Sequence, residues 1–344
     1  MIINCSIINE NFEFVEEANV VIGGKLIREV GDGFVSGALN FKNYLVMPSL
    51  INAHTHLGDS LFKGAADGLS AGAACGAGGL KWDLYKNAKR EDLIKAMRLS
   101  AEYMLNSGIS CFCDFREFGI SGINQLKEAV REIPIKSIIL GRDLSADELN
   151  ECDGLGLNLY NKNINKIKDK ILAIHAGEAE GEVKKAMKYC PDIIIHATKA
   201  NDDEIKEISE KNISVVCCPR SNLALCCGIP RIQKMLDSGI NVSLGTDNVM
   251  VNSPCMWREM EFTSRVCEIE QKTVLRMATI NPATQFKLNS GIIREGRDAD
   301  LIFIGKYSMN LKFNRDWISA IVNRCESENV RKVMIEGRLV VDKD

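Results

Sequence analysis

Eight short apolar segments between residues 45 and 246 constrain the fold of this chain more than any other feature. Stretches of helical periodicity lie between several of them, such as Glu91 to Ser107, which ends before Gly108. Strands that alternate with helices indicate βαβ units and a parallel sheet. The expected strands are Leu45 to His56, Ile109 to Phe115, Ile135 to Leu140, Leu155 to Tyr160, Ile171 to His175, Ile193 to His196, Ser214 to Cys218 and Val242 to Thr246.

Eight such strands favour an α/β protein built on a (β/α)₈ TIM barrel. A single barrel of this kind takes about 200 to 250 residues. The chain has 344 residues, so the length leaves room for a second, smaller domain.

Both ends of the chain differ from the middle. Residues 1–47 alternate short apolar runs with turn signals, and after an expected last helix at Lys272 to Ala278 the tail returns to strand-like segments. We therefore expect both ends to meet in one small composite β-sandwich domain. The predicted domains are 1–47 (first part of the sandwich), 48–295 (the barrel) and 296–344 (second part of the sandwich).

The net charge and the cysteine pattern indicate which binding partners and which cellular compartment to expect for this protein. The formal net charge is −3 and there is no dense basic block, which argues against nucleic acid and anionic membranes as partners. Thirteen cysteines occur without any C-x-x-C pair, and the opening residues lack the pattern of a signal peptide. We expect a cytoplasmic protein with a small-molecule substrate, and a homo-oligomer is left open. The Lys-rich stretch 161–170 is interpreted as solvated surface.

Only four histidines are present, and each lies at the end of an expected strand. His54 and His56 are two residues apart, so in a strand both side chains project from one face and can converge on one ion. His175 ends the segment ILAIH, and His196 ends DIIIH. The carboxyl ends of barrel strands form the face that carries active sites. A lone histidine is more often an ordinary core or surface residue, but four at strand ends favour a functional site.

Asp247 adds a carboxylate to this group. It follows the last expected strand, and in a closed barrel the eighth strand neighbours the first, so Asp247 should lie beside His54 and His56. An aspartate at a strand end can instead cap the next helix. The following residues, NVMVNSP, delay any helix, which favours the site.

These segments, taken together, resemble the amidohydrolase superfamily, and specifically its branch of cytosine deaminase, S-adenosylhomocysteine deaminase and chlorohydrolase-like enzymes. The resemblance spans nearly the whole chain in the family's order. The matching segments are VMPSLINAHTHLGDSLFKG at 46–64, AIHAGE at 173–178, IIHAT at 194–198, SVVCCPRSNLALCCG at 214–228, VSLGTDN at 242–248, and ATINPATQFKL with GRDADLIFIG between 278 and 305.

The resemblance implies roles for individual residues. Its metal-binding pattern falls on the four residues His54, His56, His175 and Asp247, which would bind one divalent ion per chain, Zn²⁺ or else Fe²⁺. His196 would contact the reacting water or the tetrahedral adduct, Glu178 would shuttle protons, and Asp247 would also orient the nucleophile. The expected fourth strand holds no lysine that could bridge two metals, which favours a mononuclear site.

The reaction implied is hydrolysis of a non-peptide carbon–nitrogen bond, with release of ammonia from an amino-substituted heterocycle such as a nucleoside or base. Two alternatives stay open. The first is a chlorohydrolase or another cyclic C–N hydrolase of the same superfamily, and the second is a catalytically silent scaffold. A full set of metal ligands together with Glu178 argues against the scaffold.

Substrate contacts are less constrained by the sequence. Trp82 could pack on a heterocycle, although a half-buried structural tryptophan fits equally well. Arg116, Arg142 and Arg220 follow the second, third and seventh expected strands, where each could reach a polar substituent or make a surface ion pair. The segment Ser70 to Gly79 is rich in glycine and alanine, which predicts a mobile loop that is either a lid or an idle surface loop.

Overall fold

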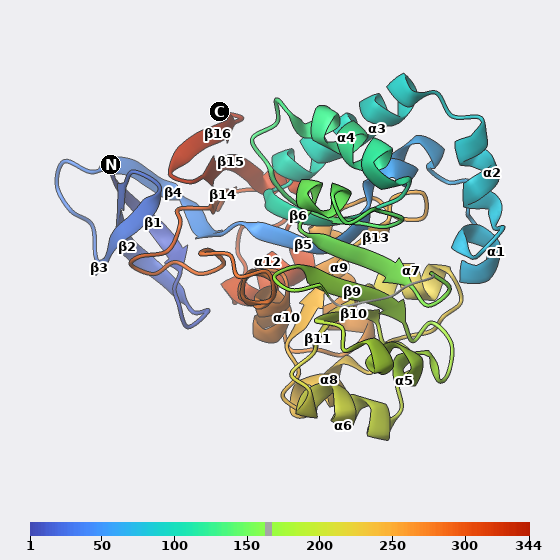
Figure 1. Ribbon diagram of the computed structural model, residues 1–344. Coiled ribbons are helices and arrows are strands. Elements are labelled where there is room, and N and C mark those ends of the chain that lie inside the picture. Colours follow the sequence, from blue (N-terminus) through green and yellow to red (C-terminus); the bar gives the residue numbers. More distant parts are fainter. Residues whose placement is uncertain (162–166) are drawn as a thin grey trace. The chain divides into compact units, whose positions relative to one another are not determined.

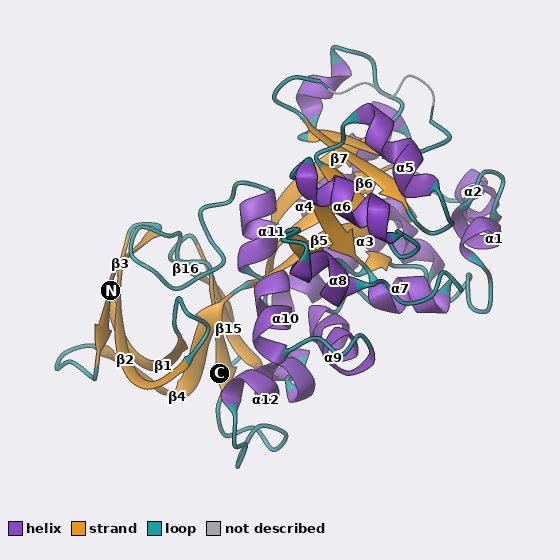
Figure 2. Ribbon diagram, turned by 90° about the horizontal axis from the view of Figure 1, so that it is seen from below, coloured by secondary structure: helices purple, strands orange, loops and turns teal. Residues whose placement is uncertain are grey.

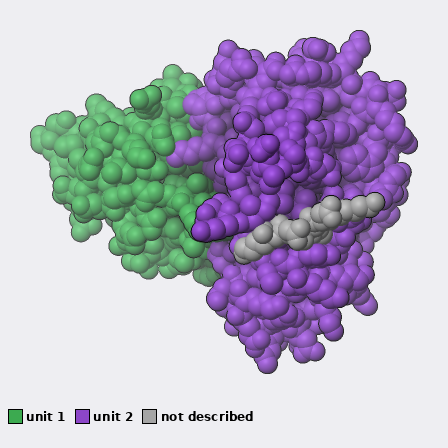
Figure 3. All heavy atoms as spheres, viewed as in Figure 1, with its two compact units in different colours: residues 1–51, 103–110, 255–344 green, residues 52–102, 111–254 purple. Residues whose placement is uncertain are grey.

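The computed structural model describes residues 1–161 and 167–344, so the expectation for the Lys-rich stretch falls partly outside the described residues. The chain divides into two compact units (Figure 3). The first comprises Met1–Ile51, Tyr103–Ser110 and Cys255–Asp344, and the second comprises Asn52–Glu102 and Cys111–Pro254. No helix in the described part of the chain combines the length and the apolar character that crossing a membrane requires.

The larger sheet has nine strands and contains seven parallel pairs of neighbours, which confirms the α/β class. Their order in the sheet is β12-β11-β10-β9-β8-β7-β6-β5-β13. The strands are β5 (Leu50–His56), β6 (Ile109–Arg116), β7 (Lys136–Gly141), β8 (Gly154–Asn158), β9 (Ile171–Ala176), β10 (Ile193–His196), β11 (Ser214–Cys217), β12 (Val242–Leu244) and β13 (Asp247–Asn248). Strand β10 pairs in parallel with both β9 and β11, and Figure 1 shows β9 and β10 side by side.

This sheet curls so that its two ends approach one another. Strand β13, at one end of the order, is separated in sequence from β12, at the other end, only by Gly245 and Thr246. A Cβ atom at Gly245 would lie 2.7 Å from the Cβ of His54, so this close approach of two backbones requires glycine. The result is a barrel-like arrangement in which Asp247 pairs with Thr55 of β5.

Helices and 3₁₀ turns connect these strands, and α4, α5, α6 and α8 lie outside the strands (Figure 2). Helix α6 shows why such segments form locally, since Asn201 and Glu204 make a reciprocal capping box at its start. The connecting elements are η1 (Leu57–Phe62), α1 (Ala71–Cys75), α2 (Leu80–Lys86), α3 (Arg90–Asn106), α4 (Gly119–Val130), η2 (Glu148–Glu151), α5 (Glu182–Ala186), η3 (Met187–Tyr189), α6 (Asp202–Glu210), α7 (Pro219–Ala224) and α8 (Ile232–Asp237).

A second sheet of seven strands combines both ends of the chain, in the order β16-β15-β14-β4-β1-β2-β3. The antiparallel pairing of β14 with β4 is one of the contacts between the two ends. The buried side chains of Ile3, Val20 and Phe303 belong to its apolar core. The strands are β1 (Ile2–Ile8), β2 (Phe14–Gly23), β3 (Leu26–Asp32), β4 (Leu39–Pro48), β14 (Leu301–Gly305), β15 (Val330–Ile335) and β16 (Arg338–Asp342).

The expected strand from Leu45 to His56 is in fact two strands. β4 ends at Pro48 and β5 begins at Leu50. The backbone N–H of Ser49 bonds to the carbonyl of Asp300, just before β14, whereas the N–H of Leu50 bonds to the carbonyl of Gly108, just before β6. Pro48 has no N–H to donate, which suits the end of a strand. The expected single strand therefore contains a change of sheet, at Pro48 and Ser49.

The expectation that Lys272 to Ala278 is the last helix is wrong. That segment is α10 (Gln271–Met277), and later helices follow it, namely α11 (Ile280–Gln285), α12 (Trp317–Arg324) and the short η4 (Ser327–Asn329). Helix α9 (Met256–Val266) precedes it. Pro282 lies in the first turn of α11, where a missing N–H is tolerated, and Asp316 caps α12 by accepting from the N–H of Ser319. These two helix-start signals, at Pro282 and Asp316, were not recognised because strand-like segments follow in the same part of the sequence.

The segment Ser70 to Gly79, expected as a loop, is helical in part. It contains helix α1, and the hydroxyl of Ser70 accepts from the N–H of Ala73 as the N-cap. The four alanines of the segment favour a helix, and its glycines favour a loop. The alanines decide the conformation of residues 71–75.

Candidate active site

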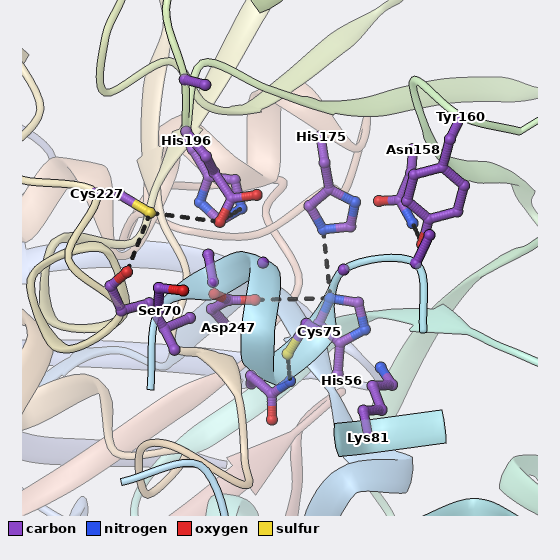
Figure 4. Close-up of a pocket in the computed structure, with 18 of the residues that line it drawn as sticks. His56, Ser70, Cys75, Lys81, Asn158, Tyr160, His175, His196, Cys227 and Asp247 are labelled. Atoms are coloured by element: carbon purple, nitrogen blue, oxygen red, sulfur yellow. Dashed lines mark hydrogen bonds and ion pairs between the residues drawn. The ribbon is translucent and has the colours of Figure 1, made fainter. Parts of the chain in front are cut away.

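Four side chains from three strands meet at the carboxyl end of the parallel sheet, and Figure 4 labels three of them, His56, His175 and Asp247. His54 and His56 come from β5, His175 from β9 and Asp247 from β13. One ligand atom from each lies within 4.8 Å of all the others. The side chains of His54, His56 and Asp247 are buried. The predicted adjacency of Asp247 and His54 is present, with Nε2 of His54 lying 3.1 Å from Oδ1 of Asp247.

The spacing of these atoms fits one metal ion. Nε2 of His175 lies 3.2 Å from Nε2 of His54 and 3.3 Å from Nε2 of His56. Ligands about 2.0 Å from an ion at the corners of a tetrahedron are about 3.3 Å apart. Ring nitrogens at these separations are better placed to bind one shared cation than to hydrogen-bond to one another. The donor set of three imidazoles and one carboxylate is that of a divalent metal site.

Protonation of the imidazoles agrees with this arrangement. Burial lowers the pKa of His54 to about 3 and holds that of His175 well below its usual range, so both rings are neutral. Nδ1 of His56 lies 3.0 Å from Oε1 of Glu117. Because a carboxylate only accepts, Nδ1 carries the proton and Nε2 presents a lone pair to the cluster. Nδ1 of His54 and of His175 make no hydrogen bond with the described residues.

Asp247 is fixed on both oxygens. Oδ1 faces His54, and Oδ2 accepts from the hydroxyl of Ser221. Burial alone would raise its pKa, but the hydrogen bond with His54 and the surrounding imidazoles hold the pKa well below its usual range. Its backbone has φ 58°, a left-handed conformation that is costly for a residue with a Cβ and that concentrates at functional sites.

Glu178 and His196 lie together at the same cavity, with Oε1 of Glu178 3.9 Å from Nε2 of His196. His196 also has a left-handed backbone, with φ 80°. The side-chain NH₂ of Asn222 lies 3.0 Å from Nδ1 of His196, and an amide NH₂ can only donate. Nδ1 is therefore the acceptor, and Nε2 of the neutral ring carries the proton toward the cavity.

Gly177 is required for the turn that places Glu178. It has φ 94°, and a Cβ at this position would lie 2.7 Å from the Cα of Ala197, next to His196. Only glycine allows strands β9 and β10 to send their following residues this close together. The sequence His-Ala-Gly-Glu thus forms a short turn between β9 and Glu178.

The cavity over this cluster has a volume of about 450 Å³. One wall comes from the segment Ser70 to Trp82, and the indole N–H of Trp82 donates to the carbonyl of Gly76. Asn158 and Tyr160 form part of the wall near His175 (Figure 4). The described lining of the cavity includes both Trp82 and Glu178, so the predicted aromatic and acidic residues share one space.

The three arginines singled out from the sequence have different positions. Arg142 lines the cavity and is 3% exposed, and its Nε and Nη2 make no hydrogen bond within the described part of the chain, although Nη2 is 3.9 Å from Oε1 of Glu117. Arg116 instead lies buried against Asp114 and Glu117. Arg220 bonds to residues 252 and 253. Of the three, Arg142 is the one among the cavity-lining residues.

Sequence reasoning missed four polar residues around the cluster. Ser221 and Asn222 belong to the segment SVVCCPRSNLALCCG, which resembles the family, so the resemblance could have indicated that they lie beside the site. Glu117 directly follows Arg116 at the end of β6, which offered a weaker signal. Lys81 gave none, because a lysine is expected at the surface and this one is 3% exposed.

A barrel-like parallel sheet with three histidines, one aspartate and a nearby glutamate at its carboxyl end defines the class of metal-dependent hydrolases. The sequence model described as "Amidohydrolase family" matches residues 45–189 and 161–340. The chain belongs to the amidohydrolase family, which confirms the resemblance found in its sequence.

Individual relatives agree with this assignment. An uncharacterised protein of Methanocaldococcus jannaschii is 35% identical over 85% of this chain and 86% of its own. The 5-methylthioadenosine/S-adenosylhomocysteine deaminase of Caldanaerobacter subterraneus is 26% identical over 97% of this chain and 90% of its own. The structure of an adenosine deaminase from Xanthomonas campestris with bound zinc shares the fold, with a TM-score of 0.80, 19% identity, and coverage of 99% of this chain and 93% of that one.

Proposed function

We propose that this protein is a metal-dependent aminohydrolase that releases ammonia from an amino-substituted heterocycle of the nucleoside or nucleobase type. The observation that carries the proposal is the convergence of three histidine Nε2 atoms and the Asp247 carboxylate on one point, in a cavity that also holds Glu178. The names of relatives that deaminate adenosine derivatives support it.

His54, His56, His175 and Asp247 are proposed to hold one divalent metal ion per chain. Zinc is the proposed ion, since it accepts imidazole and carboxylate ligands in tetrahedral sites, and Fe²⁺ is the alternative. When bound, such an ion lowers the pKa of a water molecule toward about 7 and so supplies hydroxide near neutral pH.

The proton transfers are assigned to Glu178. Its side chain is 32% exposed, so the carboxylate reaches into the cavity while its backbone is held by the Gly177 turn. It would accept a proton from the attacking water and return it to the ring or to the leaving nitrogen. The proton on Nε2 of His196 points to the same space and would stabilise the oxygen of the tetrahedral adduct. Asp247 would orient the attacking water.

Two side chains are proposed to hold the substrate. Trp82 offers an aromatic face to the heterocycle. The N–H groups on Nε and Nη2 of Arg142, which make no hydrogen bond with the described residues, favour a substrate with a polar acceptor or an anionic substituent, because a buried donor without an acceptor is costly.

The remaining features are proposals as well. We propose that the seven-stranded sheet is part of a β-sandwich, with domains at 1–47, 48–295 and 296–344, which the pairing of β4 with β14 supports. We propose a cytoplasmic location, supported by the free thiols of Cys75 and Cys227 at the cavity. A homo-oligomer is compatible with the proposal, and the oligomeric state can be measured by sedimentation.

The test is a screen for released ammonia. Protein loaded with Zn²⁺ is incubated with aminated purines, pyrimidines, pterins and their nucleosides. The proposal expects ammonia from at least one of these compounds. Chloride release from chlorinated rings, with no ammonia from any aminated ring, would favour the chlorohydrolase alternative instead. Hydrolysis of a cyclic C–N bond would show as a ring-opened product.

A further inference from the structure

A cluster of buried charges lies directly behind His56. The ammonium of Lys81 is 2.6 Å from Oε1 of Glu117 and 2.9 Å from Oδ2 of Asp59. All three side chains are buried. Buried charges of this kind persist only when they are paired, so each of these contacts constrains the others.

Glu117 connects this cluster to the metal site. Its Oε1 accepts a hydrogen bond from the ammonium of Lys81 and another from Nδ1–H of His56. The distance from Nδ1 of His56 to Oε1 is 3.0 Å. Its Oε2 accepts a hydrogen bond from the guanidinium of Arg116. The carboxylate is thus held on both oxygens, and its fixed position determines which nitrogen of His56 faces the cluster.

Lys81 comes from the part of the chain that covers the cavity. It lies on α2, and residues from Ser70 to Trp82 line one wall. Figure 4 places Lys81 next to His56. The same segment is tied down by the bond from the N–H of Ala71 to the carbonyl of Leu225. A single carboxylate therefore joins the covering segment to one of the proposed metal ligands.

We propose that Glu117 and Lys81 are positioning residues for the metal: Glu117 fixes the ring of His56, and Lys81, carried by the segment that covers the cavity, fixes Glu117. The inference rests on the proposed function in one respect, since it takes His56 as a metal ligand. Groups that hydrogen-bond the second nitrogen of a ligating histidine set its tautomer and raise its basicity.

The experiment measures Co²⁺ binding to metal-free protein by competition with a chelator, together with the visible absorption of the bound Co²⁺. Glu117→Gln keeps the size and an acceptor oxygen but removes the charge. It should weaken Co²⁺ binding by about 10- to 100-fold and shift the absorption bands. Glu204→Gln is the matched control, because Glu204 is also a buried carboxylate but bonds the backbone N–H groups of Lys184 and Asn201.

Lys81 is tested by a second pair of variants, which keeps the inference falsifiable if Glu117→Gln does not fold. Lys81→Met should weaken Co²⁺ binding by about tenfold, and Lys81→Arg should restore it, because it keeps a cation for Glu117. Lys86→Met, on the exposed side of the same helix, should bind like wild type.

Wild-type affinity and unchanged absorption in both Glu117→Gln and Lys81→Met would overturn this inference while leaving the metal site itself standing. Wild-type protein that binds no Co²⁺ would overturn the proposed function, and this inference with it. The two failures are therefore distinguishable in one set of titrations.

Discussion

The side-chain amide of Asn222 donates to Nδ1 of His196 across 3.0 Å and so directs the protonated Nε2 of that ring into the cavity. The two residues come from consecutive strand ends, β10 and the turn of α7 after β11. Asn222 is 1% exposed, so water cannot easily replace it as a donor.

Replacing Asn222 with leucine should lower kcat. The substitution keeps the branched shape of the side chain but removes the donor, so the ring can adopt the other tautomer. One hydrogen bond worth about 1.5 kcal/mol corresponds to about a tenfold loss of rate. Steady-state kinetics on the substrate found in the screen measure the change, with metal content as the control. Unchanged kcat would show that the tautomer of His196 does not matter for turnover.

Glu178→Gln separates proton transfer from metal binding. The variant keeps the size of the side chain but cannot accept a proton, so turnover should fall by about 10² to 10⁴. Metal content by elemental analysis should stay at the wild-type level. Glu180→Gln, two residues along and exposed, is the control and should retain activity. If the Glu178 variant loses its metal, the residue is a ligand rather than a proton shuttle.

Removal of the metal should destabilise the protein. An ion bound only by the folded state at a concentration about 1,000 times its Kd contributes about 4 kcal/mol. Chelator-treated protein should therefore unfold at a lower temperature by calorimetry, and added Zn²⁺ should restore the midpoint. His54→Ala should unfold at the same temperature with and without Zn²⁺. A midpoint in that variant that still rises with Zn²⁺ would place the bound ion elsewhere.

The segment from Ser70 to Lys86 should loosen when Lys81 loses its charge. Lys81→Met removes the ion pairs with Asp59 and Glu117, so backbone amides of this segment should exchange hydrogen faster in solution. Lys86 lies on the same helix and makes an exposed pair with Asp83, so Lys86→Met should exchange like wild type. Equal exchange in both variants would mean that Lys81 does not anchor the segment.

Much of the candidate site could be predicted because, in a strand, the spacing of residues in the sequence determines which face of the sheet their side chains lie on. His54 and His56 share a face by the two-residue period of a strand, and barrel closure brings Asp247 to the same place although it is far along the chain. These relations depend on the backbone alone. They need no knowledge of how individual side chains pack.

The remaining features depend on tertiary pairing. Lys81 and Glu117 look like surface residues in the sequence, and only the folded structure brings their charges together out of water. The change of sheet at Ser49 is marked in the sequence only by Pro48 and Ser49, which interrupt an otherwise apolar run. Helix α1 forms within a segment whose glycines suggest a loop, since the Ser70 cap and neighbouring alanines outweigh them locally.

The most direct test of the central claim is a titration of metal-free protein with Zn²⁺, followed by ammonia release from the substrate identified in the screen. A single site formed by three histidines and Asp247 predicts that activity rises in proportion to added Zn²⁺ and reaches its plateau at about one equivalent per chain. Full activity in the metal-free protein, or a plateau at two equivalents, would contradict the assignment of one catalytic metal.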